Sequence, residues 1–90
     1  MAGKRTRMDI IGDMLSSIIN KGGKIKPTHL MYRSNLSHVQ MKSYLEELIE
    51  KKFVKSTKSH NNRVIAITDK GYDFVSRLQE IKEFERTFGL

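Results

Sequence analysis

The stretch that decides the fold runs from Met31 to Phe53 and reads Met-Tyr-Arg-Ser-Asn-Leu-Ser-His-Val-Gln-Met-Lys-Ser-Tyr-Leu-Glu-Glu-Leu-Ile-Glu-Lys-Lys-Phe. It predicts a helix with a strong start, because Ser37 is a favoured N-cap residue and Gln40 can complete a capping box. Leu36, directly before the cap, can pack against the first turn as a hydrophobic staple. Because a short helix and a tight turn precede the cap, this arrangement is typical of a helix-turn-helix.

The capped helix, expected over residues 37–52, has two faces of different polarity. One face repeats apolar residues at helical spacing, namely Met41, Leu45, Leu48 and Ile49. The opposite face carries Gln40, Ser43, Glu47 and Glu50. An apolar stripe against a core and a polar amino end are typical of a recognition helix that enters a DNA groove.

Caps and turn formers predict the elements that precede this helix. Thr6 and Asp9 predict the start of a first helix, which ends at Gly22-Gly23. Segment 24–26 is expected to form a single edge strand, and a short helix is expected from about Pro27 to Ser34, since proline suits a first helical turn. The core face expected for the first helix consists of Met8, Ile11, Leu15, Ile18 and Ile19.

The second half of the chain predicts a hairpin and a long helix. Segments 53–56 and 63–67 are rich in β-branched and aromatic residues, and the polar segment 57–62 between them contains turn formers. Thr68 is a favoured cap for a last helix, expected from about residue 69 to residue 88. The order of elements predicts a mainly α fold with a small β-hairpin, a winged helix-turn-helix with a long C-terminal helix. We expect residues 1–68 to form a basic winged-helix core with hairpin 53–67 as its wing, and residues 69–90 to form a dimerisation helix of the same domain.

Positive charge is concentrated in the first part of the chain. The formal net charge of the 90 residues is +7. Residues 1–68 hold 13 Lys and Arg against 5 Asp and Glu, a net charge of +8, whereas residues 69–90 hold 4 against 5, a net charge of −1. A basic surface that served only solubility would not show this division, whereas a phosphate-binding face would.

Other classes of function find little support in the residues. Cysteine is absent, which excludes disulfides and thiolate metal sites. The longest apolar run, Val64–Ile67, is far shorter than the roughly 20 residues that span a bilayer, and no apolar stretch follows the first basic residues as in a secretory signal. No acidic residue stands at metal-ligand spacing with His29, His38 or His60. We expect no enzyme, metal, cofactor, small-molecule ligand or membrane partner, and a cytoplasmic, nucleoid-associated protein.

The residues expected to contact DNA come from four segments. The capped helix supplies Ser37, His38, Gln40, Lys42 and Ser43, and the short helix with its entrance supplies Lys26 and Arg33. The hairpin supplies Lys55, Lys58, His60 and Arg63, and a basic arm at the start supplies Arg5 and Arg7 beside Lys4. For Ser37 and Gln40, capping alone remains an equally good interpretation.

Apolar residues of the last helix extend beyond the reach of a winged core. Such a core can cover Tyr72, Phe74 and Val75, but a monomer would leave Leu78, Ile81, Phe84 and Phe88 in water. Several of these positions fit a heptad seam. We therefore expect a homodimer through Phe74, Leu78, Ile81, Phe84 and Phe88, with the direction of pairing open. The alternative is a tail that folds back on the first helix of its own chain.

Three segments also resemble a known family. They are 26–44, which contains His-Leu-Met-Tyr-Arg-Ser-Asn-Leu-Ser, then 45–54, and 67–74 with its Thr-Asp-Lys-Gly start. They resemble the archaeal ten-kilodalton winged-helix DNA-binding proteins of the 10a type, and the resemblance covers nearly the whole chain. It implies sequence-tolerant or regulatory DNA binding and dimerisation through the last helix as an antiparallel coiled coil. The chain departs from the family at Val39, where a basic or polar residue is usual, and at Lys52, where glycine is usual.

Two functions from different classes remain. The first is a homodimeric duplex DNA-binding protein, a transcription regulator or chromatin-type protein that binds through helix 37–52 and the basic wing. The second is a winged-helix protein–protein assembly module. The confinement of the +8 net charge to residues 1–68 favours DNA binding, because an assembly module does not require it.

Overall fold

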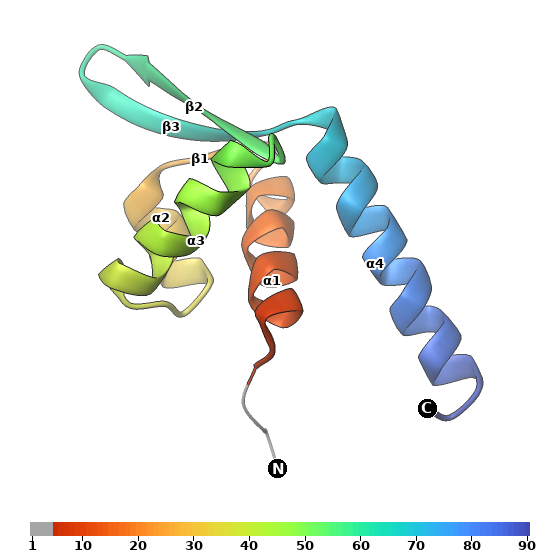
Figure 1. The fold of residues 1–90 in the computed structure, drawn as a ribbon. Coiled ribbons are helices and arrows are strands. Elements are labelled where there is room, and N and C mark those ends of the chain that lie inside the picture. Colours follow the sequence, from red (N-terminus) through yellow and green to blue (C-terminus); the bar gives the residue numbers. More distant parts are fainter. Residues whose placement is uncertain (1–4) are drawn as a thin grey trace.

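A computed structural model describes residues 5–90, so Lys4 of the expected basic arm lies outside the described residues. The elements are α1 (Arg7–Asn20), β1 (Lys24–Ile25), α2 (Pro27–Arg33), α3 (His38–Glu50), β2 (Val54–Ser59), β3 (Asn62–Ile67) and α4 (Asp69–Thr87). Figure 1 shows α1, α2 and α3 grouped beneath a small sheet, while α4 runs beside α1 and leans away from it towards its C-terminal end. The sheet is antiparallel, with strand order β1-β3-β2. The expected fold class, a winged helix-turn-helix with a long C-terminal helix, is confirmed.

Local hydrogen bonds fix the helix starts as the sequence predicts. The Ser37 N–H donates to Gln40 Oε1 at 3.0 Å, and the Gln40 N–H donates to Ser37 Oγ at 3.2 Å. Thr6 and Asp9 form the same box at the start of α1, with distances of 2.9 and 3.0 Å. Both boxes join residues close in sequence, which is why their residue types alone predict them.

The end of α3 explains the departure at Lys52. This residue has a φ of 67°, in the left-handed region that glycine adopts without strain. Its N–H donates to the Ile49 carbonyl and the Phe53 N–H donates to the Leu48 carbonyl, which together form a Schellman motif. The lysine therefore takes the glycine position, at a conformational cost of about 1 kcal/mol.

The core lies between α1, α2, α3 and the inner face of the sheet. It includes Ile10, Ile11, Met14, Leu15, Ile18, Ile25, Leu30, Leu36, Met41, Leu45, Leu48, Val54, Ile65, Ile67 and Val75. The core face expected for α1 was wrong at Met8, which is exposed. It also omitted Ile10 and Met14, which are buried. The helix is covered by α2 and the sheet on one side and by α4 on another, so its buried face is wider than a single apolar stripe.

The wing is longer than the sequence indicates. Segment 57–62 was expected to be a loop, but β2 and β3 extend into it and leave a two-residue turn at His60 and Asn61. Both turn residues have positive φ, 49° and 68°, as the favoured tight hairpin turn requires. Lys58, His60, Asn61, Asn62 and Arg63 are exposed, so the outer wing lacks the apolar alternation that reveals a half-buried strand.

The first half of α4 is attached to the rest of the domain. The Thr68 hydroxyl accepts from the Gly71 N–H at 3.1 Å and lies 2.7 Å from the Lys52 carbonyl oxygen, to which it donates. The Phe74 ring lies 4.9 Å from the Phe53 ring, centroid to centroid. Leu78, expected in water in a monomer, is half-buried, and its side chain approaches α1 at Gly12. That expectation was wrong because α4 packs along α1 as far as Leu78, whose side chain lies against the position of Gly12.

Candidate nucleic-acid interface

The amino end of α3 presents a mixed surface. At about 100° per residue, Val39, Ser43, Glu46 and Glu50 form a ridge opposite the buried Met41, Leu45 and Leu48. All four ridge residues are exposed. The amino half of the ridge therefore presents an apolar group and a hydroxyl, and the other half presents two carboxylates. The amino end also carries the positive end of the helix dipole, which favours approach to an anion.

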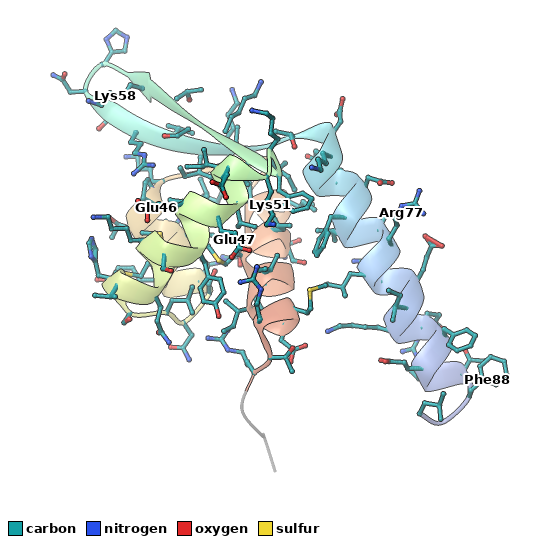
Figure 2. The ribbon with its side chains drawn as sticks, in the orientation of Figure 1. Glu46, Glu47, Lys51, Lys58, Arg77 and Phe88 are labelled. Carbon is teal, nitrogen blue, oxygen red and sulfur yellow. The ribbon has the colours of Figure 1, made fainter. Side chains whose placement is uncertain are left out.

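Glu47 does not belong to this exposed face. It was expected there with Ser43 and Glu50, but it is partly buried and forms an ion pair with Arg7. Figure 2 shows Glu46 and Glu47 on neighbouring positions of α3. The pairing could not be seen in the sequence, because it depends on α1 passing beside α3.

Basic groups from α3 and the wing meet at one hollow. It has a volume of about 270 Å³ and lies between the start of α2, β3, and the part of α3 from His38 to Glu46, whose carboxylate is the acidic group of the lining. Its lining residues are Pro27, His38, Met41, Lys42, Leu45, Glu46 and Arg63. Three residues expected to contact DNA, His38, Lys42 and Arg63, are thus brought together although Arg63 lies 21 positions after Lys42 in the sequence.

The wing carries its charge along both strands. Lys58 lies directly opposite Arg63 in the strand register, and both are exposed. Arg63 Nε donates to Ser56 Oγ at 2.7 Å, which holds the guanidinium along the wing. Like charges opposite each other destabilise a hairpin, so the charges of Lys58 and Arg63 do not favour its folding. His60 lies in the turn and Lys55 near the base of the wing; Figure 2 labels Lys58 on the wing, at the opposite end of the molecule from Phe88.

A second basic hollow lies at β1 and α2. Its volume is about 480 Å³, and it is lined by Lys21, Lys24, Ile25, Lys26, His29 and Val64. No acidic side chain lines it, and no ion pair of the described residues involves these lysines. The sequence predicted Lys26 but missed Lys21 and Lys24, for which the excess of positive charge in residues 1–68 was the only signal. Arg33 lies apart from both hollows, at the end of α2.

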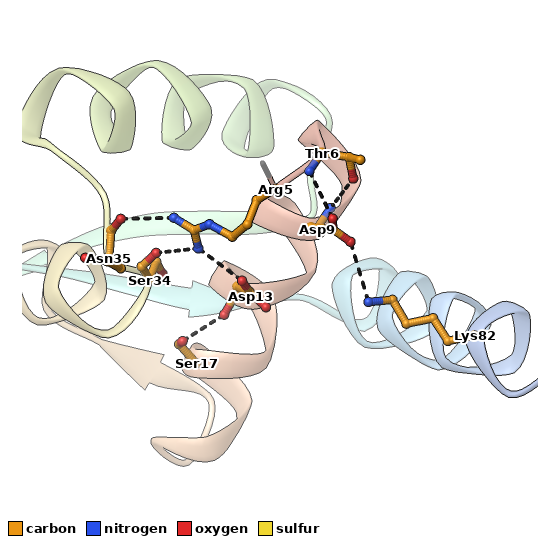
Figure 3. A network of polar contacts seen from close by, with 8 residues as sticks. All are labelled: Arg5, Thr6, Asp9, Asp13, Ser17, Ser34, Asn35 and Lys82. Atoms are coloured by element: carbon orange, nitrogen blue, oxygen red, sulfur yellow. Dashed lines mark hydrogen bonds and ion pairs between the residues drawn. The ribbon is translucent and has the colours of Figure 1, made fainter. Parts of the chain in front are cut away.

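The two arginines of the expected arm have partners within the chain. Arg5 donates to the Ser34 carbonyl at 2.8 Å and the Asn35 carbonyl at 3.0 Å, and it pairs with Asp13 at 3.1 Å (Figure 3). Arg5 thereby ties α1 to the turn between α2 and α3. Arg7 pairs with Glu47, as described above. Contact of either arginine with DNA remains a prediction, and the structure gives both a role in holding α3 in place.

Asp9 connects the same region to α4. The hydrogen bond that it accepts from the Thr6 backbone is the main reason that the pKa of Asp9 is lowered, with smaller effects from the Thr6 hydroxyl and Lys82. Lys82 Nζ lies 3.6 Å from Asp9 Oδ1 (Figure 3). Residues 5–9 thus contact the turn before α3, α3 itself and α4.

The outer half of α4 exposes large apolar side chains. Ile81, Phe84 and Phe88 are 55%, 59% and 65% exposed. The Phe84 and Phe88 rings contact each other, with centroids 4.8 Å apart. Of the five residues expected at a dimer interface, Phe74 and Leu78 therefore have partners in the core of their own chain, and these three do not.

Within residues 5–90, no three His, Cys, Asp or Glu side chains are arranged to hold a metal ion. None of the helices described there combines the length and apolar character needed to cross a membrane.

Comparison with known proteins gives one family and one curated relative. The model of the winged helix-turn-helix family matches residues 4–86. An uncharacterised protein of Methanocaldococcus jannaschii is 28% identical over 78 residues, which are 87% of this chain and 34% of that protein. The chain thus spans about a third of the length of that relative.

Solved structures share the fold. Sso10a-2, a DNA-binding protein from Sulfolobus solfataricus, has a TM-score of 0.80 at 21% identity, covering 93% of this chain and 85% of that chain. F93 from STIV, a winged-helix DNA-binding protein, has a TM-score of 0.75 at 18% identity, covering 91% and 92%. The PcaV transcriptional regulator from Streptomyces coelicolor has a TM-score of 0.79 at 13% identity, covering 94% and 63%. The resemblance to 10a-type proteins is thus confirmed for the fold, and the chain belongs to the winged helix-turn-helix family.

Proposed function

We propose that the protein binds duplex DNA as a homodimer, as a transcription regulator or chromatin-type protein associated with the nucleoid. The observation that carries this proposal is the convergence of His38, Lys42 and Arg63 at the hollow between α3 and the wing. The names of similar structures agree with it, since Sso10a-2 and F93 are described as DNA-binding proteins. In this proposal residues 1–68 are the DNA-binding head, and residues 69–90 are the dimerisation helix of the same domain.

The head offers separate groups for groove and backbone. The amino end of α3 would enter the major groove with Val39 and Ser43 foremost. Lys58, His60 and Arg63 of the wing would follow the phosphate backbone on one side. Lys21, Lys24, Lys26 and His29 around the second hollow would contact phosphates on another. The cost of placing Lys58 opposite Arg63 supports this assignment, because a phosphate between two cations relieves their repulsion.

The dimer would form through the outer half of α4. At about 100° per residue, Ile81, Phe84 and Phe88 lie roughly a third of a turn away from Leu78 and Lys82, which face α1. The helix can therefore contact its own α1 and a second α4 at once. Burying exposed large apolar side chains against each other is the usual driving force of such an association.

Charge favours antiparallel pairing of the two α4 helices. An antiparallel pair centred on Ile81 places Arg77 opposite Glu85 of the partner subunit. A parallel pair instead places Glu85 opposite the partner subunit's Glu85, where the like charges repel each other. In Figure 2 Arg77 points away from α1, on the side that a second copy could approach. Its bond to Asp73, 3.1 Å long, is the main cause of a raised pKa of Arg77 and holds the guanidinium on that side.

The salt dependence of binding tests the proposed function. If five to eight phosphates are neutralised, log K should fall against log[salt] with a slope of roughly −4.5 to −7. Removing Lys58 and Arg63 with alanine should weaken binding to all sequences alike and reduce the slope by about 2. Arg86→Ala is the matched control, because it removes a charge from the outer half of α4, outside the head. No binding at low salt, or binding that ignores salt, would contradict the proposal and leave the assembly module as the better interpretation.

A further inference from the structure

Val39 is the most exposed large apolar side chain of the described head, at 76%. It is the second residue of α3 and lies on the exposed ridge beside Ser43. Valine is branched at Cβ and keeps essentially one side-chain rotamer in a helix, so its methyl groups are held in a fixed place. Nothing in the folded chain requires valine here, because it contributes little burial and is a poorer helix former than alanine. Its exposed methyl groups are therefore available to contact a partner.

The polar groups beside Val39 are largely used within the helix start. Ser37 Oγ and Gln40 Oε1 both accept hydrogen bonds of the capping box. His38 turns to the hollow that it lines with Arg63. At the amino half of the ridge this leaves Val39 and Ser43, and the ridge itself contains no arginine or lysine.

Further along the same ridge, Glu46 and Glu50 are exposed carboxylates. Carboxylates are repelled by phosphates, so the second half of the ridge cannot lie as close to DNA as the first half. The head would therefore make its closest approach to the groove at Val39 and Ser43. A base edge that meets Val39 must offer an apolar group, because valine can neither donate nor accept a hydrogen bond.

We infer that Val39 contacts the C5 methyl group of thymine, and that this protein prefers duplexes with thymine at that point of the major groove. Thymine is the only one of the four standard bases that presents a methyl group there. 5-Methylcytosine presents the same group and should be accepted equally. The inference rests on the proposed DNA binding and adds what the amino end of α3 recognises.

The test removes the methyl group from each partner in turn. Binding is titrated with a short alternating A·T duplex and with the same duplex in which uracil replaces thymine, for the unmodified protein and for Val39→Ala. The unmodified protein should bind the thymine duplex about fourfold more tightly for each methyl group contacted, whereas Val39→Ala, which loses both γ-methyl groups, should lose most of this preference. Val39→Thr, which keeps one methyl group, should retain part of the preference. In an alternating G·C duplex, methylation of cytosine C5 should raise the affinity of the unmodified protein by a similar factor.

Tyr32→Ala is the matched control, because Tyr32 is an equally exposed apolar side chain of the neighbouring helix α2. It should keep the preference for thymine. Val39→Ala should fold normally, since alanine is the better helix former at this exposed position, and its melting temperature verifies this. Equal binding of both duplexes by the unmodified protein, or an undiminished preference in Val39→Ala, would overturn the inference and leave DNA binding intact. Absence of binding to every duplex would overturn both.

Discussion

The head and the outer half of α4 present opposite kinds of surface. In the head the large apolar side chains are mostly buried, and the exposed surface is rich in lysine and arginine. In the outer half of α4 the order is reversed, because Ile81, Phe84 and Phe88 are exposed among charges of both signs. A basic surface attracts a polyanion, whereas an apolar stripe gains free energy only by contact with another apolar surface.

The difference indicates that the two regions are built for different partners. The first half of α4 joins them, through Phe74 against Phe53, Leu78 at Gly12 and Lys82 beside Asp9. Because of this attachment, the direction in which α4 leaves the head is fixed by packing. Two heads joined through α4 would therefore present their α3 helices in a fixed relation, as binding to paired half-sites requires.

The largest effect is expected from charging the apolar stripe. Ile81→Glu with Phe88→Glu should convert a dimer to a monomer, because each subunit loses two apolar contacts that are worth about 1.5 kcal/mol or more apiece. Association should weaken by more than about 100-fold, as measured by mass in solution across a concentration series.

Ser76→Glu with Gln79→Glu is the matched control for this pair. It adds the same charge to exposed positions on other faces of α4, about a third to half of a turn from the apolar stripe, and should leave the dimer intact. An unmodified protein that is already monomeric at ~100 µM would show that α4 is not the interface, since useful association requires a Kd below that range.

The next effect concerns the joint between head and helix. A Cβ at Gly71 would lie 2.3 Å from the Phe53 carbonyl oxygen, which is backbone and cannot move aside easily. Gly71→Ala should therefore lower the free energy of unfolding by about 2–3 kcal/mol, which corresponds to a drop in melting temperature of roughly 10 °C or more.

Gly12→Ala is the comparison variant for Gly71→Ala. Its Cβ would meet only the end of the Leu78 side chain, at 2.8 Å, and a flexible side chain can move. The gain in helix propensity of about 1 kcal/mol should offset most of the crowding, so the melting temperature should change little. Equal losses at both glycines would mean that the contact of Leu78 with α1 at Gly12 tolerates an added methyl group no better than the start of α4 does at Gly71.

A smaller effect is expected from the charges of the wing. Lys58→Glu replaces a like-charge pair across the hairpin with an opposite-charge pair, because a carboxylate then faces Arg63. The substitution should stabilise the fold by a few tenths of a kcal/mol and weaken DNA binding at the same time. Thermal unfolding and a DNA titration on the same sample check both signs. Loss of stability together with unchanged binding would mean that Lys58 serves the fold and not a partner.

Much of the fold could be predicted because its signals are local. The capping boxes of Ser37 with Gln40 and Thr6 with Asp9 each lie within four residues, and the apolar stripe of α3 repeats along one helix. The tight wing turn escaped prediction because an exposed hairpin lacks apolar alternation. The positive φ of Lys52 could not be predicted from the residue type. Its backbone conformation is set by the end of α3 and by the burial of the first residue of β2, and not by the conformational preference of lysine.

The candidate site was less predictable than the fold. The residue types of His38, Lys42 and Arg63 indicated DNA, but their meeting at one hollow depends on packing between α3 and the wing. In the same way, the partners of Arg5 and Arg7 come from residues at least eight positions away in the sequence, which only the fold brings near. Leu78 was misplaced because its partner in the fold, Gly12, lies 66 residues earlier in the sequence.

The smallest effect concerns Asp9, which belongs to the head and faces Lys82 of α4. Its pKa is lower in the folded protein than in the unfolded chain, so its stabilising contribution is present at neutral pH. That contribution should be lost as the pH falls below about 3.9, the ordinary value for aspartate, and through the lower folded pKa. The measurement is the difference in melting temperature between the unmodified protein and Asp9→Asn, from neutral pH down to acid.

Lys82→Ala separates the two origins of this effect. Because hydrogen bonds from Thr6 lower the pKa of Asp9 more than Lys82 does, the Lys82→Ala protein should keep most of the pH-dependent difference. The ion pair between head and helix is exposed on both sides, and solvent screens it, so it should add little. A pH dependence that disappears in Lys82→Ala would mean that Lys82 lowers the pKa of Asp9 more than Thr6 does. The attachment of α4 would then depend on charge at Asp9 as well as on the packing of Phe74 and Leu78.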